Sequence, residues 1–342
     1  MNVEKKYYPA LDGLRAYSAL AVVAAHTGLA FFSQGWIGIN FFFVLSGFLI
    51  TTILIRSKEA TNYFSVFYAR RFLRIFPIYY FVLGCAIGVA LYKNLDVSSC
   101  WYYFFYIQNF PLSAHGFSIS GFPHWLDHTW TLAIEEQFYI FFPLLVWFFK
   151  PRGLTIACII IIMVTLANRY VFYSHFHLGN TFSSLDCLAA GALISIGLKH
   201  YKASRLIGIL FALFIILSLG CLLSKNPMQP FLATALLPFI CLTVMVLITQ
   251  SNILITALFE NRLIVYMGKI SYGIYLYHYP IIFIADWLAI KYAATLPINP
   301  YLLTALKFIV IVVVSSLSFR WFESRILLLK KKFTYSYPTK TA

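Results

Sequence analysis

The chain has 342 residues, of which 61% are hydrophobic and 19% aromatic, while only 11% carry a charge. Soluble globular proteins average about 25% charged residues, so this composition excludes a soluble domain and indicates a polytopic membrane protein. The formal net charge of +15 is compatible with binding to nucleic acid or to anionic lipid. We interpret it mainly as membrane topology, with the lipid bilayer as the partner and no nucleic acid.

Ten apolar stretches are interpreted as membrane-spanning helices. They cover approximately residues 14–33, 36–55, 77–92, 131–149, 154–173, 183–198, 206–224, 229–250, 271–290 and 301–323. With the N-terminus inside, all but five of the 26 Lys and Arg residues fall at or near cytoplasmic ends, as the positive-inside rule expects. The five exceptions are Lys93, Arg169, Lys225, Lys291 and Lys307. The sequence therefore predicts an all-α transmembrane bundle of about ten spans, with both termini in the cytoplasm.

The chain is expected to form one membrane domain over residues 1–342, with spans from about residue 14 to residue 323 and a short tail at 324–342. The aromatic run at 100–110 has about eleven residues, too few to cross a bilayer, so we expect it to be re-entrant or interfacial. The tail is basic, with Lys330, Lys331 and Lys332. We interpret it as an anchor on anionic lipid.

The first predicted span contains two polar residues, Arg15 and His26, eleven positions apart in LDGLRAYSALAVVAAH, with Asp12 close by. Eleven steps of about 100° return to within about 20° of the start, so a helix places Arg15 and His26 on one face, about 16 Å apart. A cation and an imidazole in lipid are costly and indicate an intramembrane function. The separation is roughly that of an extended pantetheine arm. Arg15 could thus hold coenzyme phosphates while His26, expected near mid-span, meets the thioester. The alternatives are a snorkelling Arg15 and a structural His26.

The run FYARRFLRIFPIYY places two cations, Arg71 and Arg74, three residues apart and hence on one helical face. Pro77 is expected to open the third span directly after them. Paired guanidinium groups bind phosphate in a bidentate manner, which makes this pair a candidate phosphate site. A positive-inside stop signal is the alternative interpretation.

Two adjacent carboxylates, Glu135 and Glu136, occur in HTWTLAIEEQFYIFFPLL, within about two turns of the outer end of the fourth predicted span. Adjacent helical positions face different directions, so at most one of them should point into a polar site. An ion pair with Arg169 or another intramembrane cation is the alternative.

Two further motifs lie near the end of the chain. In GKISYGIYLYHYP, Tyr272 and His278 offer hydrogen-bond partners inside a bundle, and a structural role is as plausible as a catalytic one. In SFRWFES, Arg320 and Glu323 are three residues apart at the cytoplasmic face, where they could simply pair with each other.

Taken together, these blocks resemble the acyltransferase-3 family of bacterial integral-membrane O-acyltransferases. The match runs from about Tyr8 to Glu323 through YPALDGLRAYSALAVVAAH, GWIGINFFFVLSGFLIT, FYARRFLRIFP, HTWTLAIEEQFYIFFP and ISYGIYLYHYP, in that order. The resemblance implies transfer of an acetyl or other short acyl group from cytoplasmic acyl-CoA to a hydroxyl group of an envelope glycan, in the bacterial inner membrane and without a metal. Acceptors in this family include lipopolysaccharide O-antigens, exopolysaccharides, nodulation oligosaccharides and macrolides. The expected acceptor of this chain is an envelope glycan or lipid-linked saccharide, and a small molecule such as a macrolide is the alternative.

The expected site combines these motifs. His26 is implied to be the general base, and Glu135 is expected to act with it. The candidate ligands of acetyl-CoA are Arg15, Arg71 and Arg74. The candidate supporting residues are Asp12, Glu136, Tyr272, His278 and Glu323. A covalent acyl-histidine relay is the alternative mechanism. A transporter or flippase without chemistry of its own is the alternative function, although the sequence shows no inverted repeat.

Overall fold

The computed structural model describes residues 7–28, 30–114, 119–171, 179–200, 229–292 and 299–338, together with positions 202, 209 and 212. Within these residues every regular element is a helix, so the predicted all-α class is confirmed. Almost all of the predicted span 206–224 lies outside the described residues. Apolar runs become helices in lipid because only a helix satisfies its backbone N–H and C=O groups within one segment.

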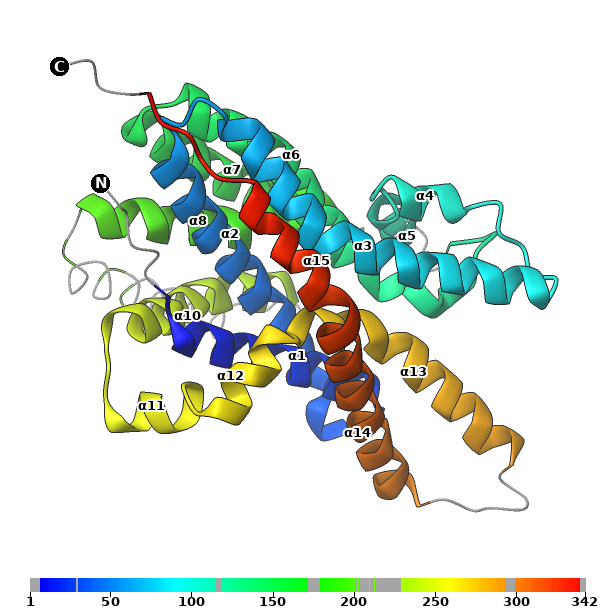
Figure 1. Cartoon of the computed structure of the whole chain (residues 1–342). Helices are drawn as coiled ribbons and strands as arrows, with labels where there is room; N and C mark the ends of the chain where they lie inside the picture. Colours follow the sequence, from blue (N-terminus) through cyan, green and yellow to red (C-terminus); the bar gives the residue numbers. More distant parts are fainter. Residues whose placement is uncertain are drawn as a thin grey trace.

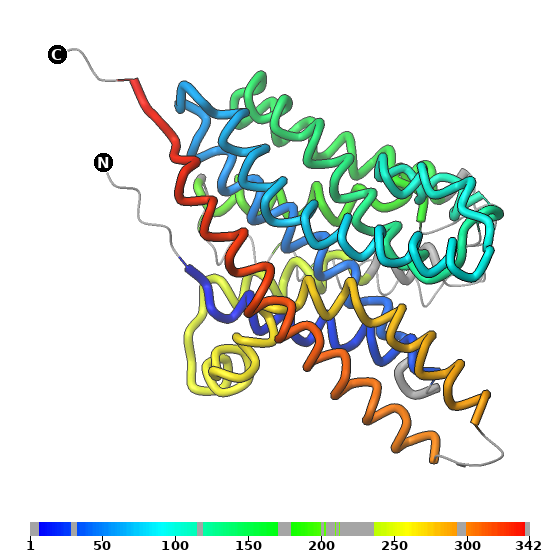
Figure 2. Tube along the Cα trace, turned by 45° about the vertical axis from the view of Figure 1, so that its right-hand side comes forward, coloured from blue at the N-terminus to red at the C-terminus, as the bar shows by residue number. Residues whose placement is uncertain are grey.

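The longer helices are α1 (Pro9–His26), α2 (Ile37–Ser57), α3 (Tyr63–Tyr92), α6 (Trp130–Phe148), α7 (Pro151–Val171), α8 (Leu185–His200), α10 (Gln229–Thr249), α13 (Ser271–Lys291) and α14 (Pro300–Ser318). The shorter ones are η1 (Ala30–Trp36), α4 (Cys100–Phe104), α5 (Asn109–Ala114), η2 (His124–Thr129), η4 (Thr181–Ser183), α11 (Ile253–Phe259), α12 (Arg262–Lys269), η5 (Phe319–Glu323), α15 (Ser324–Leu328) and η6 (Leu329–Lys332). Both chain ends lie at one end of the bundle, which we call the terminal end (Figures 1 and 2). The ends of α3 and α13 diverge toward the opposite, distal end.

Six segments are long and apolar enough to cross a membrane. They are Ser33–Ser57, Tyr63–Tyr92, His124–Phe148, Pro151–Arg169, Ser271–Lys291 and Pro300–Lys332. A seventh span is formed if the bent pair Leu236–Thr249 and Ile253–Phe259, which meet at 108°, crosses as one unit. The predicted spans 14–33 and 183–198 correspond to α1 and α8. These two helices are too short or too polar to be counted as candidate membrane spans. The described part of the chain thus supports six or seven candidate spans, fewer than the sequence predicts.

The first predicted span, 14–33, is not one continuous helix. Helix α1 ends at His26, where the Thr27 hydroxyl donates to the Ala24 carbonyl at 2.7 Å. Gly28 then takes a positive φ of 80°, a conformation that glycine adopts without strain and that commonly terminates helices. His26 therefore lies at the end of α1, and the expectation of a mid-span position is wrong.

Helix α3 is longer than the predicted span 77–92. It begins at Tyr63, so Arg71 and Arg74 are inside the helix, and Pro77 lies in its interior instead of opening it. Prolines are tolerated within membrane helices because neighbouring groups satisfy the freed carbonyl. The aromatic run at 100–110 forms the short helices α4 and the start of α5, neither long enough to cross a bilayer.

Glycines bring helices into backbone contact at the centre of the bundle. A Cβ atom on Gly47 of α2 would lie 1.9 Å from the Leu188 carbonyl oxygen of α8, and one on Gly191 would lie 2.0 Å from that of Val44. A Cβ atom on Gly268 of α12 would similarly meet the Asp12 carbonyl oxygen at 1.9 Å. Such small-residue contacts let membrane helices approach closely. They fix α1, α2, α8 and α12 against one another, and so they fix the polar side chains these helices carry.

Candidate functional site

Polar side chains from five helices line one narrow cavity of about 80 Å³ inside the bundle, which we call the arginine cavity. Its polar lining comprises Arg15, Ser46, Arg71, Arg74, Thr131, Glu135, Tyr139, Ser271, Tyr272 and Tyr275. The three arginines expected to bind a coenzyme therefore converge, although α1 and α3 are separated in the sequence. Tyr272 also lies here, where its hydroxyl donates to the Ile75 carbonyl at 3.0 Å.

Among its described lining residues, the arginine cavity contains one carboxylate, that of Glu135, and the neighbouring guanidinium groups of Arg71 and Arg74. Glu135 accepts a hydrogen bond from the Ser46 hydroxyl at 2.7 Å, and the Arg71 guanidinium lies 4.8 Å from the centre of the Tyr139 ring. Within the described part of the chain, neither Arg71 nor Arg74 is within ion-pair distance of a carboxylate. A guanidinium without a protein anion is suited to bind a phosphate.

A second cavity, the inner vestibule, opens from Arg15 and Arg74 toward the terminal end and has a volume of about 370 Å³. Its polar lining is Tyr7, Tyr8, Asp12, Arg15, Arg74, Lys269, Tyr272 and Glu323. Asp12 accepts from Arg15 at 3.1 Å and from the Tyr7 hydroxyl at 2.7 Å. Partial burial and the hydrogen bond to Asp12 raise the pKa of Tyr7 to about 12. Through its hydrogen bond with Arg15, the Asp12 carboxylate thus holds the Arg15 guanidinium group in place.

Glu323 reaches the inner vestibule because α14 continues into the π-helical turn η5. Such turns occur frequently at functional sites. Glu323 is buried and accepts from the Ser318 hydroxyl at 3.3 Å, whereas Arg320 is exposed. Among the described residues Arg320 and Glu323 form no ion pair, so the simple pairing considered for them is wrong.

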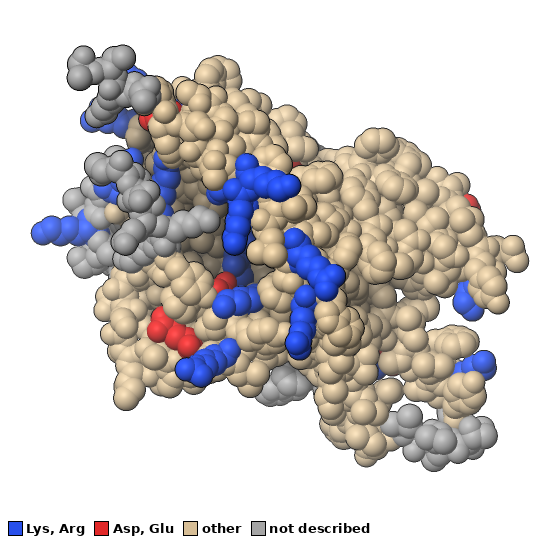
Figure 3. All heavy atoms as spheres, viewed as in Figure 1, with Lys and Arg blue, Asp and Glu red and all other residues tan. Residues whose placement is uncertain are grey.

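A third cavity, the basic vestibule, has a volume of about 460 Å³, and none of its described lining residues is acidic. Its charged and aromatic lining is Arg56, Phe67, Arg70, Arg71, Arg74, Lys330, Lys331, Tyr335 and Tyr337. The C-terminal tail forms one wall because it is hydrogen-bonded to Asn62: the Asn62 amide donates to the Thr334 carbonyl at 2.8 Å, and the Ser336 N–H donates to Asn62 at 2.9 Å. On the face that Figure 3 shows, the visible Lys and Arg side chains lie mainly on the half of the molecule that carries the termini.

Three histidines from separate elements meet on the distal side of the arginine cavity. The ring of His278 lies 5.1 Å from that of His26 and 4.7 Å from that of His128. The Nδ1 atom of His26 is 2.8 Å from the Val22 carbonyl, so it carries the proton and leaves Nε2 as the basic nitrogen. His278 is held in the same way by the Tyr275 carbonyl. Neither ring nitrogen of the buried His128 has a hydrogen-bond partner among the described residues.

His26 and His128 line a fourth cavity of about 220 Å³, the outer cavity, together with Asn40, Arg169 and Ser184. The side chains of Ile39, Phe43 and Tyr275 line both the outer cavity and the arginine cavity. Arg74 in turn lines the arginine cavity and both vestibules. Both vestibules therefore adjoin the arginine cavity, which in turn shares a wall with the outer cavity beside the histidines.

The two carboxylates Glu135 and Glu136 differ in environment, as adjacent helical positions should. Glu135 lines the arginine cavity, whereas Glu136 is buried outside it and its Oε1 has no hydrogen-bond partner among the described residues. Arg169 is not the partner of either residue, because it pairs with Asp186 at 2.8 Å, so that alternative is wrong. Glu135 and His26 line different cavities and are not joined by any hydrogen bond in the described part of the chain.

Sequence reasoning missed several residues of the site. Ser46, Tyr139 and Tyr275 lie within the quoted motifs, but an apolar helix gives no sign of which hydroxyl faces a cavity. His128 is the first residue of the quoted motif HTWTLAIEEQFYIFFP, but it lies at the polar start of that motif, where a histidine gives no sign that it joins a buried cluster. Lys330 and Lys331 were expected to be lipid anchors, yet they line the basic vestibule.

Comparison with known proteins gives a consistent picture. A family model described as an acyltransferase domain matches residues 8–321. The chain is 29% identical to a peptidoglycan O-acetyltransferase, OatA, of Listeria monocytogenes over 81% of this chain and 50% of the relative. It is 30% identical to YrhL of Bacillus subtilis, named a putative peptidoglycan O-acetyltransferase, over 81% and 49%. It is 26% identical to the O-acetyltransferase OatA of Staphylococcus aureus over 94% and 57%. The chain thus spans about half the length of these relatives. No solved structure matches.

Proposed function

The chain belongs to the acyltransferase-3 family, and from this premise we propose that it is a membrane O-acetyltransferase of the bacterial cell envelope. It takes an acetyl group from acetyl-CoA at the terminal end and delivers it to a hydroxyl group at the distal side. The observation that carries this proposal is the series of adjoining cavities between the arginines and His26. A transporter would not need a basic nitrogen at the end of such a path.

The nucleotide part of acetyl-CoA is too highly charged to enter lipid, so it stays at the terminal end. The basic vestibule, with its arginines, lysines and tyrosines and no carboxylate, supports binding of the phosphates there. The pantetheine arm then follows the arginine cavity. Because Arg15 and His26 lie on one helix eleven residues apart, α1 spans about 16 Å between them.

In the proposed reaction, Nε2 of His26 removes the proton of the acceptor hydroxyl as its oxygen attacks the thioester carbonyl. The new C–O bond forms, the C–S bond breaks, and the sulfur leaves as CoA thiol with the proton that His26 has accepted. No metal takes part in this scheme. Glu135 lies among the arginines and lines a different cavity from His26, which favours an electrostatic role beside the coenzyme over direct contact with the hydroxyl. An acyl-histidine intermediate remains the alternative mechanism.

The acceptor is proposed to be an envelope glycan. Two of the relatives are named for peptidoglycan, which makes peptidoglycan a candidate besides lipopolysaccharide O-antigen and exopolysaccharide. A small molecule such as a macrolide is the second candidate class. The glycan approaches the outer cavity from the distal side, which this proposal places outside the cytoplasmic membrane, with both termini in the cytoplasm.

The paired arginines should bind acetyl-CoA through their planar guanidinium groups. The double variant Arg71→Lys, Arg74→Lys keeps both charges but loses bidentate geometry, so acetyl-CoA binding should weaken about tenfold. Calorimetry on purified protein in detergent measures this. The matched control is Arg152→Lys with Arg262→Lys, two exposed arginines that line none of the four cavities. Unchanged affinity in the first variant would return Arg71 and Arg74 to a role in topology.

The proposed sidedness has its own test. Tyr92, at the distal end of α3, is 88% exposed, and Glu59, between α2 and α3, is also exposed. Single variants Tyr92→Cys and Glu59→Cys are made in a chain whose native cysteines have been replaced. A membrane-impermeant thiol reagent added to intact spheroplasts should label the first and spare the second, and permeabilised cells should show both labelled. Labelling of the Glu59 variant in intact cells would contradict the orientation.

A further inference from the structure

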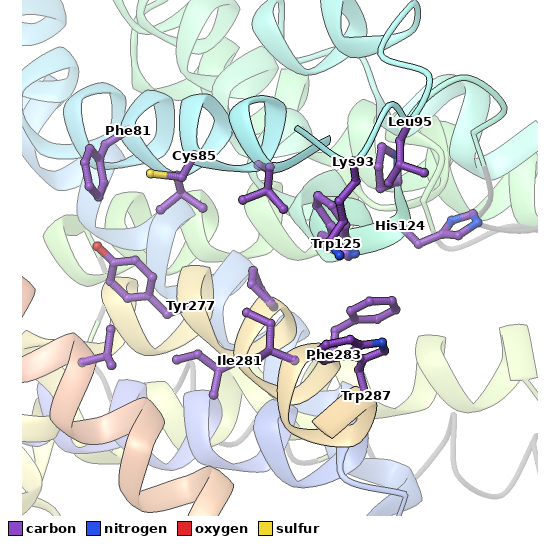
Figure 4. Close-up of a pocket in the computed structure, with 17 residues that line it drawn as sticks. Phe81, Cys85, Lys93, Leu95, His124, Trp125, Tyr277, Ile281, Phe283 and Trp287 are labelled. Carbon is purple, nitrogen blue, oxygen red and sulfur yellow. The ribbon is translucent and has the colours of Figure 1, made fainter. Parts of the chain in front are cut away.

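A separate apolar cleft lies between α3 and α13, and it is larger than each of the four cavities above, with a volume of about 600 Å³. Figure 4 shows Phe81 and Cys85 of α3 facing Tyr277 and Ile281 of α13 across it. Apart from Lys93, His124 and the hydroxyl of Tyr277, the cleft is lined by apolar and aromatic side chains. In Figure 1 the two helices diverge toward the distal end. The cleft is therefore a lateral, lipid-compatible space that the proposed acetyl path does not use.

Two cations converge on one aromatic ring at the distal end of this cleft. The Nζ atoms of Lys93 and Lys291 lie 5.5 Å and 4.9 Å from the centre of the Trp287 ring. Among the described residues neither lysine is within ion-pair distance of a carboxylate. The neighbouring Asp286 is engaged by Lys307. The rim of the cleft thus carries two positive charges that form no ion pair with any described carboxylate.

These lysines belong to the five cations that depart from the positive-inside pattern. Arg169 and Lys307 are accounted for by their ion pairs with Asp186 and Asp286. Lys225 lies outside the described residues. Among the described residues, Lys93 and Lys291 are then the remaining outer cations that form no ion pair with a carboxylate. Both lie at the mouth of the cleft. Hydrocarbon walls beneath an uncompensated cationic rim match a lipid with a phosphate in its head group.

We propose that the cleft binds the hydrocarbon chain of a polyprenyl-phosphate-linked saccharide, with its phosphate held by Lys93 and Lys291. The inference rests on the proposed function and names its acceptor class: a sugar that is still attached to its lipid carrier. Helix α13 connects the two sites, because Tyr277 and Ile281 line the cleft while His278 faces His26 and His128. Trp287 is nine residues beyond His278, which corresponds to about 13 Å along the helix. The saccharide spans this distance from the rim to the histidines.

Lipid binding by the full chain in detergent tests the proposal, with native mass spectrometry as the readout. The probes are a long-chain polyprenyl phosphate, the corresponding polyprenol without phosphate, and phosphatidylglycerol as a bulk anionic lipid. The wild-type protein should bind the polyprenyl phosphate at least about tenfold more tightly than either other lipid. Such a ratio would show that both the phosphate and the isoprenoid chain are recognised.

Two variants test the contribution of the two lysines at the rim and that of the apolar walls separately. The double variant Lys93→Gln, Lys291→Gln should weaken binding of the phosphate lipid about tenfold and leave polyprenol binding unchanged. Ala86→Trp, which fills the cleft from α3, should weaken binding of both the phosphate lipid and the polyprenol. If the Ala86→Trp protein does not fold, Val89→Trp is used in its place. The control for the rim variant is Lys199→Gln with Lys202→Gln, and the control for the wall variant is Ile160→Trp on the exposed face of α7. None of these three residues lines the cleft.

The outcomes distinguish this proposal from the proposed function. Equal affinity for phosphatidylglycerol, or unaltered binding in the rim and wall variants, would show that the cleft holds bulk lipid and would overturn the inference. Acetyl-CoA binding is measured on the same samples without lipid and should be normal in every variant. If the wild-type protein binds the polyprenyl phosphate but does not bind acetyl-CoA, the proposed acetyl donor is wrong. The proposed lipid site would still stand.

Discussion

Replacing His26 with alanine should lower acetyl transfer by about 10²–10⁴-fold, the usual contribution of a general base, while acetyl-CoA binding stays unchanged. The imidazole lies at the end of α1, with Nδ1 held by the Val22 carbonyl and Nε2 available as a base. Its removal takes away the proton acceptor but leaves the arginines in place. The measurements are release of CoA thiol with a glycan acceptor, and acetyl-CoA affinity, both on purified protein.

The control for this variant is Tyr17→Ala, which also truncates an aromatic ring on helix α1. Tyr17 is exposed, its hydroxyl donates to the Leu258 carbonyl at 2.9 Å, and its side chain lines neither the four cavities nor the apolar cleft. It should retain near-normal transfer. If His26→Ala also retains near-normal transfer at equal abundance, then His26 has a structural role and the proposed mechanism is wrong. Trapping of acetyl on His26 in a single turnover without acceptor would instead favour the acyl-histidine relay.

The second large effect concerns folding. Gly47→Ala places a Cβ atom 1.9 Å from the Leu188 carbonyl oxygen, so α2 and α8 must separate along their whole contact. We expect destabilisation of at least about 3 kcal/mol, at the upper end of the overpacking range, because the obstacle is backbone and cannot change rotamer. The midpoint of thermal unfolding in detergent and the yield of monodisperse protein should both fall.

Gly84→Ala is the matched control, since it makes the same change within helix α3. A Cβ atom at Gly84 meets nothing within 4 Å. Alanine is favoured over glycine in a helix by up to about 1 kcal/mol, so this variant should be neutral or slightly more stable. Equal stability of the Gly47 and Gly84 variants would mean that α2 and α8 do not cross as closely as described.

Much of the arginine cavity could be anticipated from the sequence. Charged side chains in apolar stretches must face the bundle interior, and few such residues occur. Arg15, Arg71, Arg74 and Glu135 accordingly meet in one cavity, as does Tyr272. Helical periodicity also explains why Glu136 lies elsewhere. What composition cannot supply is the relative depth of each helix, which is why Glu135 was expected near the outer side with His26 but lies among the arginines.

Other features depend on tertiary contacts that leave no pattern in the sequence. The end of α1 is set by one positive φ at Gly28, so an apolar window extends beyond the true helix. Basic residues at a chain end satisfy the positive-inside rule whether or not they line a cavity. The role of Lys330 and Lys331 therefore emerges only from the docking of the tail on Asn62. His128 joins the cluster only because η2 lies against α13, and a single sequence does not predict that contact.

The narrowness of the arginine cavity bears on the integrity of the membrane. Under the proposed function an acetyl group is carried across an energised bilayer, and such a route must not conduct ions. At about 80 Å³ the arginine cavity is the smallest of the four, and it leaves little room for water. Its three guanidinium groups oppose the passage of protons and other cations, as an arginine does in water-selective pores. In the proposed reaction the cavity must widen to admit the pantetheine arm, and the arm then displaces that water and fills the passage through which the acetyl group moves.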